Sequence, residues 1–164
     1  MAKQINRGQD GAGIGVIKLD PQFGNRYIAR KRSNSKNPVA DIFEEVNQSL
    51  QELDQDNIQN SLYLKEHFPY AGELMLGHLR YGTHGGNSLE NLHPFLRQNN
   101  WMCRNLVLAG NYNMTNVDEL FEQLIELGQQ PKEISDNVTM LEKIGHFLDV
   151  ENEKLFKQFK QEGY

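Results

Sequence analysis

The sequence predicts an α+β fold built on a largely antiparallel sheet. Segments with the character of strands occur as a hairpin and as separate pieces, and segments with helical spacing are grouped between and after them. That order differs from the regular strand–helix alternation that builds a parallel sheet. The 164 residues fit a single domain, residues 1–164, with a core of ordinary size.

The first elements form a hairpin. Residues 1–6 have the character of a final helical turn that ends at Gly8. Residues 11–19 leave a Gly-rich turn and continue as a strand, residues 20–25 have the composition of a turn, and residues 26–30 return as a second strand.

Helices and buried strands follow the hairpin. Apolar residues recur at helical spacing over residues 39–50 and more weakly over residues 58–63. Two apolar runs, residues 73–80 and 105–110, predict short buried strands. The polar stretch at residues 81–93 predicts a loop rich in Gly and Asn.

Three amphipathic segments complete the chain. Thr115 or Asn116 can cap the first, which Gly128 closes, and Ser135 or Asp136 can cap the second. Helices are therefore predicted at residues 117–125, 138–148 and 155–159.

The composition limits the classes of function. A net charge of −5 argues against a broad nucleic-acid surface, and no apolar run reaches the roughly 18–20 residues of a membrane span. The single cysteine excludes disulfides within the chain, and no signal peptide is recognisable, so we predict a cytoplasmic protein. One basic cluster is predicted to be a solvated strand face, with a phosphate or nucleic-acid site as the alternative. It comprises Arg26, Arg30, Lys31, Arg32 and Lys36.

Glycine and cysteine each raise a functional alternative. The run Gly11, Gly13 and Gly15 suggests dinucleotide binding, but that fingerprint needs a strand before the glycines and a helix after them. Here the glycines precede a strand, so we reject nucleotide binding at this run. Cys103 lies beside apolar residues, and we expect an inert side chain there rather than a nucleophile.

Three histidines raise the alternative of a metal-dependent hydrolase. His78, His84 and His93 are metal ligands by residue type, but they lie on a predicted strand and an irregular loop. Zinc sites use tighter pairs or a carboxylate at defined spacing, so we predict no metal site.

The most informative residues lie in three segments. Residues 6–13 contain Arg-Gly-Gln-Asp-Gly-Ala-Gly, and residues 77–85 read Gly-His-Leu-Arg-Tyr-Gly-Thr-His-Gly, followed by Asn-Leu-His-Pro-Phe at residues 91–95. Residues 109–116 begin Ala-Gly-Asn-Tyr. In order and spacing these segments resemble the N-terminal-nucleophile (class II) glutamine amidotransferases, closest to the glutaminase half of amidophosphoribosyltransferase-like proteins. The similarity covers residues 6–148.

The resemblance implies a four-layer αββα sandwich with antiparallel sheets. It also implies glutamine hydrolysis by an N-terminal cysteine whose own α-amino group is the base, with the ammonia passing to phosphoribosyl pyrophosphate in purine synthesis and no cofactor in this domain. The family's nucleophile lies upstream of the first motif, whereas the only thiol here is Cys103. We therefore expect a truncated, inactive domain that lacks its first strand and its phosphoribosyltransferase partner, and whose open sheet edge favours self-association into a homo-oligomer.

The resemblance assigns the substrate contacts to two ends of glutamine. Arg80 matches the arginine that binds the α-carboxylate, for which a planar guanidinium is suited. Asp136 matches the carboxylate that receives the α-ammonium. Tyr81, Thr83 and His84 match the loop that closes over the substrate.

The resemblance assigns the remaining catalytic positions less completely. Asn111 and the backbone N–H of Tyr112 match the donors of the oxyanion hole, although the family has glycine in place of Tyr112. Arg7 and Gly8 match the turn beside the nucleophile. Because of Tyr112 and the missing nucleophile, the alternative is a non-catalytic domain that binds an amino acid or a partner.

Overall fold

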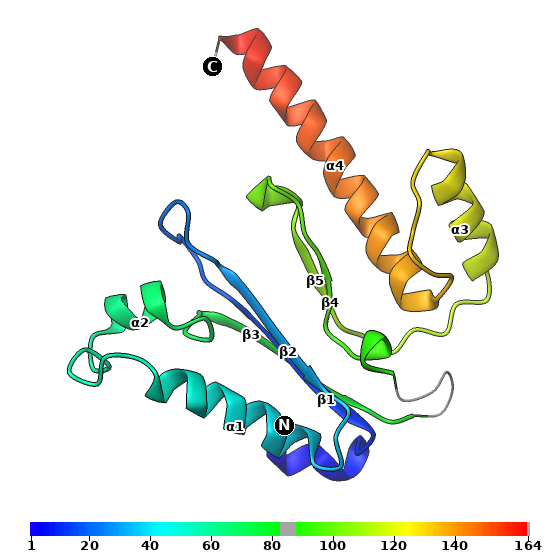
Figure 1. The fold of residues 1–164 in the computed structure, drawn as a ribbon. Helices are drawn as coiled ribbons and strands as arrows, with labels where there is room; N and C mark the ends of the chain where they lie inside the picture. The colour runs from blue at the N-terminus through cyan, green and yellow to red at the C-terminus, as the bar shows by residue number, and fades with distance from the viewer. Residues whose placement is uncertain (83–87, 164) are drawn as a thin grey trace. The chain divides into compact units, whose positions relative to one another are not determined.

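The computed structural model describes residues 1–82 and 88–163 and divides into two compact units, Met1–Pro94 and Phe95–Tyr164 (Figure 1). No helix of the described residues has both the length and the apolar character needed to cross a membrane.

The first unit contains a three-stranded antiparallel sheet in the order β2-β1-β3. The strands are β1 (Gly11–Ile17), β2 (Ile28–Ser33) and β3 (Leu74–Arg80). The central strand pairs Gly13 with Arg32 on one side and with His78 on the other. The predicted hairpin is confirmed, and its loop contains positive φ angles at Asp20 and Gly24. The returning strand begins two residues later than predicted.

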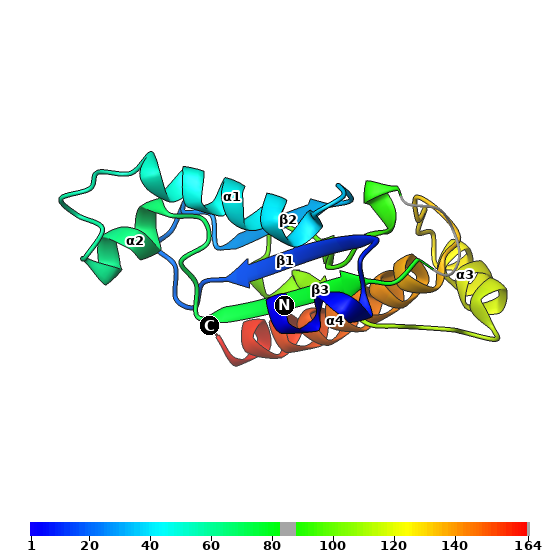
Figure 2. The same cartoon turned by 90° about the horizontal axis from the view of Figure 1, so that it is seen from below.

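One face of this sheet is covered by helix α1 (Pro38–Gln51), which lies along β1 and β2 (Figure 2). Its apolar stripe places Val39 and Ile42 against Ala12, and these three buried residues form the core of the unit. Two polar contacts also join the helix to β2: Ser33 hydrogen-bonds to Asp41, and Lys31 pairs with Glu45.

Three short helices complete the unit. Asn60 caps α2 by accepting hydrogen bonds from the N–H groups of Leu62 and Tyr63. The short helices are η1 (Ala2–Arg7), α2 (Ser61–His67) and η2 (Leu89–Asn91).

Strand β3 is not the buried strand that its apolar sequence predicts. Leu74, Met75 and Leu76 are 51%, 72% and 36% exposed. The reason is that α1 packs on β1 and β2, on the side of the sheet away from β3. An apolar run identifies a strand but does not say what covers it.

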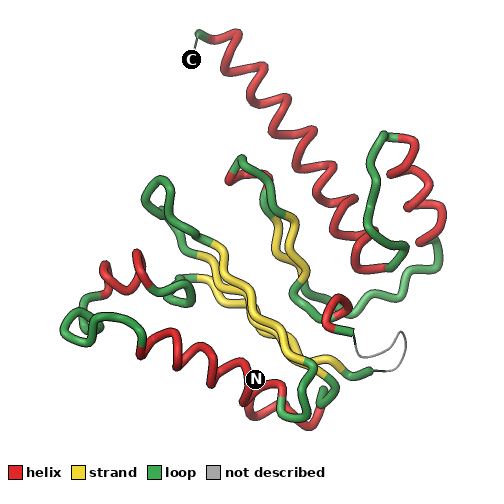
Figure 3. The backbone as a smooth tube through the Cα atoms, in the orientation of Figure 1, coloured by secondary structure: helices red, strands yellow, loops and turns green. Residues whose placement is uncertain are grey.

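The second unit pairs β4 (Phe95–Arg97) with β5 (Leu106–Leu108). Helix α4 (Asp136–Glu162) packs on these strands, and α3 (Val117–Glu126) packs on α4. The short helix η3 (Met102–Arg104) lies between the strands. Figure 3 colours the strands of this unit yellow and its helices red. Strand β5 is half-buried rather than buried as predicted.

Helix α4 is one continuous helix of 27 residues, so the prediction of two separate segments, 138–148 and 155–159, is wrong. The intervening residues contain no Gly or Pro and include good helix formers, which lets the helix continue. Of the two predicted caps, Ser135 is confirmed, because its hydroxyl accepts from the N–H of Val138, whereas Asp136 is the first residue of the helix. Gly163, with φ of 91°, ends it.

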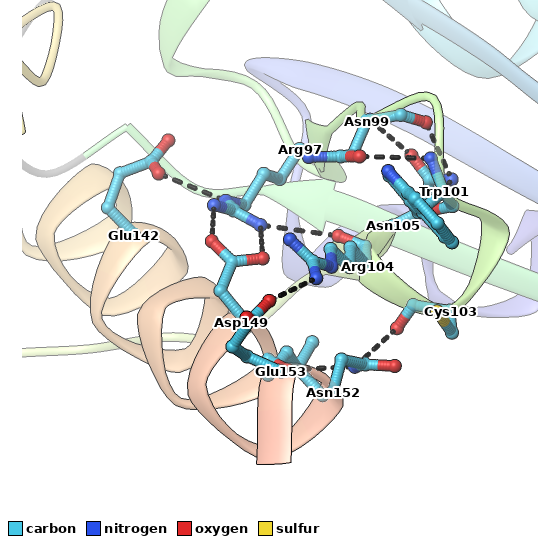
Figure 4. A network of polar contacts seen from close by, with 11 residues as sticks. Arg97, Asn99, Trp101, Cys103, Arg104, Asn105, Glu142, Asp149, Asn152 and Glu153 are labelled. Carbon is cyan, nitrogen blue, oxygen red and sulfur yellow. Dashed lines mark hydrogen bonds and ion pairs between the residues drawn. The ribbon is translucent and has the colours of Figure 1, made fainter. Parts of the chain in front are cut away.

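An arginine holds the hairpin of the second unit to α4. Arg97 of β4 donates to Glu142 at 3.2 Å and to Asp149 at 2.6 and 3.3 Å, and also to the carbonyl of Arg104 at 3.3 Å (Figure 4). The guanidinium lies against Gly145, where any Cβ would collide with it.

The two antiparallel sheets and the helices beside them confirm the predicted α+β class and the predicted antiparallel pairing.

Candidate functional site

The glycine-rich strand β1 receives a second segment of the chain on the face away from α1. Successive residues of a strand point to opposite faces, so Gly13 faces away from the helix that covers Ala12. A Cβ on Gly13 would overlap the backbone carbonyl of His93, and one on Gly11 would lie 2.5 Å from a methyl carbon of Leu92. The glycines therefore serve close backbone packing, which agrees with rejecting nucleotide binding at this run.

Arginines from both neighbouring strands hold this segment, residues 90–94. Arg32 of β2 donates to the carbonyls of Glu90 at 3.2 Å and Leu92 at 2.9 Å. Arg80 of β3 donates to the intervening carbonyl of Asn91 at 2.5 Å. We call residues 90–94 together with Arg32 and Arg80 the carbonyl clamp.

The prediction that the basic cluster is a solvated strand face is wrong for two of its members. Arg30 and Arg32 are half-buried, and Arg30 donates to the carbonyl of Pro94 at 3.3 Å. Burial lowers the pKa of both guanidinium groups from the usual value, and Arg30 further lowers the pKa of Arg32. The reason for the error is the segment 90–94, which covers this face and is far away in the sequence.

The structure brings Gly8 and Arg80 together at the end of β3. Gly8 is buried, and a Cβ there would lie 2.8 Å from the carbonyl carbon of Leu79 and 2.9 Å from the carbonyl oxygen of Arg80. Asp10 braces the same strand end, because its N–H donates to the Arg80 carbonyl at 3.1 Å and its carboxylate accepts from the N–H of Gly82 at 2.7 Å. Arg7 ends η1 immediately before this turn.

The loop predicted to close over a substrate is described only in part. Tyr81 is 69% exposed and follows Arg80 directly. Thr83 and His84 lie outside the described residues.

His93 of the carbonyl clamp contacts His78 of β3. The rings of His78 and His93 lie with their centroids 4.2 Å apart, and His93 is only 5% exposed. Burial, followed by His93 and Arg80, lowers the pKa of His78 to about 4, so its imidazole is neutral at physiological pH. Over residues 1–82 and 88–163, no three His, Cys, Asp or Glu side chains are grouped to hold a metal ion.

The remaining predicted site residues belong to the second unit, after β5. Asn111 is exposed, and Tyr112 is half-buried with its ring against Gly110, where an added Cβ would lie 2.5 Å from the ring. Asp136 lies in the first turn of α4 and accepts a hydrogen bond from the N–H of Met114 at 3.0 Å. That bond ties the chain after β5 to the start of α4.

Cys103 lies in η3 of the second unit and is exposed. That its side chain is inert rather than a nucleophile stays a prediction. Its backbone carbonyl accepts a hydrogen bond from Asn152 of α4.

Sequence reasoning missed Arg32 and Asn91 as members of the site. A signal was present in the strand pattern, since Arg30 and Arg32 are two residues apart and therefore share a face with the glycines of the paired strand. Nothing in the sequence said which segment would lie on that face.

Comparisons with known proteins point to one enzyme family. No protein-family model matches the chain. The chain is 30% identical over 145 residues to an amidophosphoribosyltransferase of Pasteurella multocida, covering 88% of this chain and 23% of that protein. It is 28% identical to one from Lacticaseibacillus casei, with 85% and 57% covered, and 32% identical to one from Methanocaldococcus jannaschii, with 73% and 19% covered.

A solved structure agrees with these relatives. Glutamine phosphoribosylpyrophosphate amidotransferase from B. subtilis, complexed with ADP and GMP, matches with a TM-score of 0.51 and 26% identity. The match covers 84% of this chain and 23% of that one, so the chain spans only part of its relatives' length. This chain therefore contains an amidotransferase-like domain that is homologous to part of the amidophosphoribosyltransferases.

Proposed function

We propose that this chain is the glutamine-binding, glutaminase-type domain of an amidophosphoribosyltransferase-like enzyme. The whole protein would release ammonia from glutamine and transfer it to phosphoribosyl pyrophosphate in purine synthesis, in the cytoplasm. The domain itself would need no cofactor and would belong to the four-layer sandwich class. The names of the relatives and of the solved structure support this proposal.

The observation that carries the proposal is the placement of Arg80. Its guanidinium is held by the carbonyl of Asn91, while its backbone carbonyl lies against the buried turn at Gly8. A fixed, planar guanidinium suits two-point binding of a carboxylate. Tyr81, Thr83 and His84 would follow it in the loop that closes over the substrate.

The resemblance assigns the other contacts with glutamine to residues 111, 112 and 136, and the turn beside the nucleophile to residues 7 and 8. Asp136, held by the N–H of Met114, would bind the α-ammonium of glutamine. The side chain of Asn111 and the N–H of Tyr112 would donate to the oxyanion that forms at the side-chain amide. Arg7 and Gly8 would shape the turn beside the nucleophile.

We also propose that this chain alone binds glutamine without hydrolysing it. The family chemistry uses an N-terminal cysteine, and the only thiol here, Cys103, lies in η3 of the second unit. The phosphoribosyltransferase part would belong to the remainder of the full-length protein.

The test is titration of the isotope-labelled chain with L-glutamine, followed by two-dimensional NMR. We expect shifts at the ends of β3 and α4 and an affinity on the order of millimolar. Arg80→Lys should weaken binding by about tenfold or more, because an ammonium cannot reproduce the two-point contact. Arg26→Lys is the matched control, since Arg26 is exposed and, among the described residues, donates to the nearby carbonyl of Ile28.

Two results would contradict the proposal: no shift with L-glutamine in the folded chain, or D-glutamine binding equally well. Glutamate production by the chain that disappears on Cys103→Ser would contradict the predicted inactivity.

The second candidate is a non-catalytic domain that binds an amino acid or a partner. The observation that favours it is Tyr112, whose ring occupies the space beside Gly110 at the predicted oxyanion hole. Assaying the full-length gene product separates the two functions. Glutamate release supports the enzyme, whereas glutamine binding without glutamate release supports the second candidate.

A further inference from the structure

The carbonyl clamp contains an arginine to which the proposed reaction assigns no role. Arg32 donates hydrogen bonds to the carbonyls of residues 90 and 92, and Arg80 donates to the carbonyl of residue 91 between them. The two arginines approach from β2 and β3, on opposite sides of the central strand β1. They therefore hold three successive peptide groups from two directions.

The segment between them has little room to shift. It lies directly on the glycines of β1, where the His93 carbonyl occupies the place of a Cβ at Gly13. Leu92 is fully buried with 0% exposure, His93 is 5% exposed, and Arg30 holds the carbonyl of Pro94. A peptide confined in this way is a firm support for Arg80.

The guanidinium groups gathered on this face of the sheet require the backbone carbonyls of residues 90–94 as acceptors. Arg30, Arg32 and Arg80 share the face with His78, and Glu90 is the acidic residue that acts on Arg32. The guanidinium groups of Arg30 and Arg32 repel each other, and backbone carbonyls offset the desolvation of these groups. If Arg32 loses its two carbonyls, the peptide that anchors Arg80 loses its opposing restraint.

We propose that Arg32 is a positioning residue for Arg80, acting through the peptide groups of residues 90–92. Its effect on glutamine rests on the function proposed above, whereas its effect on the Arg80 guanidinium rests on the geometry alone. Arg32 itself touches no substrate and would set the orientation of the carboxylate-binding guanidinium.

The test reads the Arg80 side chain directly. The guanidinium N–H signals of the isotope-labelled chain are assigned to Arg80 by their loss in Arg80→Lys. Arg32→Met keeps the apolar stem and removes both hydrogen bonds, and we expect exchange of the Arg80 signals with water to accelerate on the order of tenfold. Arg32→Lys, which can reach one carbonyl, should restore part of the protection and also serves if Arg32→Met does not fold. Arg26→Met is the control and should change nothing.

Glutamine titrations complete the experiment. Arg32→Met should weaken binding on the order of tenfold in the native background but add little in the Arg80→Lys background, because both act on the same contact. Unchanged Arg80 signals in a folded Arg32 variant, or losses that simply multiply, would overturn the proposal. If the native chain binds no glutamine while Arg80 still responds to Arg32→Met, the proposed function fails and the positioning role stands.

Discussion

The ion network of the second unit offers a prediction with a defined magnitude. Arg97 makes side-chain contacts with Glu142 and Asp149, and the Asp149 hydrogen bond in particular raises the pKa of Arg97 above its usual value. The side chain of Arg97 is 15% exposed, and those of its two partners are 27% and 29% exposed. The network is therefore neither fully buried nor a surface pair.

The expected cost of Arg97→Met follows from this intermediate burial. Breaking a buried pair costs about 3–5 kcal/mol, because it leaves a buried charge, whereas exposed pairs contribute about 0.2–1 kcal/mol. Two carboxylates and one carbonyl lose their donor here, but water reaches each carboxylate in part. We expect Arg97→Met to lower the free energy of unfolding by about 2–3 kcal/mol.

The assay is urea unfolding, monitored by the fluorescence of Trp101. This single tryptophan lies in the second unit and reports on its unfolding. A double-mutant cycle with Asp149→Asn should give a coupling energy of about 1 kcal/mol or more. Lys154→Met is the control, because Lys154 and Glu151 form a pair that is 66% and 65% exposed and should contribute less than about 0.5 kcal/mol. A cost for Arg97→Met no larger than that of the control would refute the argument that partial burial makes this network strong.

Two further predictions concern the first unit. Gly13→Ala should lower the free energy of unfolding by about 3 kcal/mol, because the new methyl group must displace the His93 carbonyl. In the control Gly24→Ala the methyl group meets no atom within 4 Å, so the cost should be about 1 kcal/mol, from the positive φ alone. Thermal unfolding compares the two variants, and equal effects would contradict the packing role of Gly13. The His78 imidazole has a pKa of about 4 in the folded chain against 6.5 ordinarily, so the unfolded chain takes up its proton first as the pH falls. The contribution of neutral His78 to the free energy of unfolding should be fully present above about pH 6.5 and decline toward about pH 4, by about 1–2 kcal/mol since water reaches part of the ring. In urea titrations at a series of pH values, His78→Asn should remove this part of the pH dependence.

The sequence predicted most local elements correctly because their signals are local. Helix α1 has an apolar stripe, the β1–β2 hairpin has its turn residues, and the start of α4 has a serine cap, all read from neighbouring positions. Where the signal was the absence of a stop, as in the middle of α4, the prediction of two helices failed. The motifs at residues 77–85 and 109–116 likewise indicated the family, which the relatives support.

By itself the sequence determined the α+β class, the strand pairing of the hairpin and the positions of Arg80, Asn111 and Asp136 along the chain. Tertiary structure alone decided that the glycines of β1 make room for residues 90–94, and that Arg30 and Arg32 are half-buried donors to backbone carbonyls. It alone decided that β3 is an exposed edge. The physical reason is that periodicity reports which side chains share a face, whereas what covers that face depends on a segment about 60 residues away in the chain.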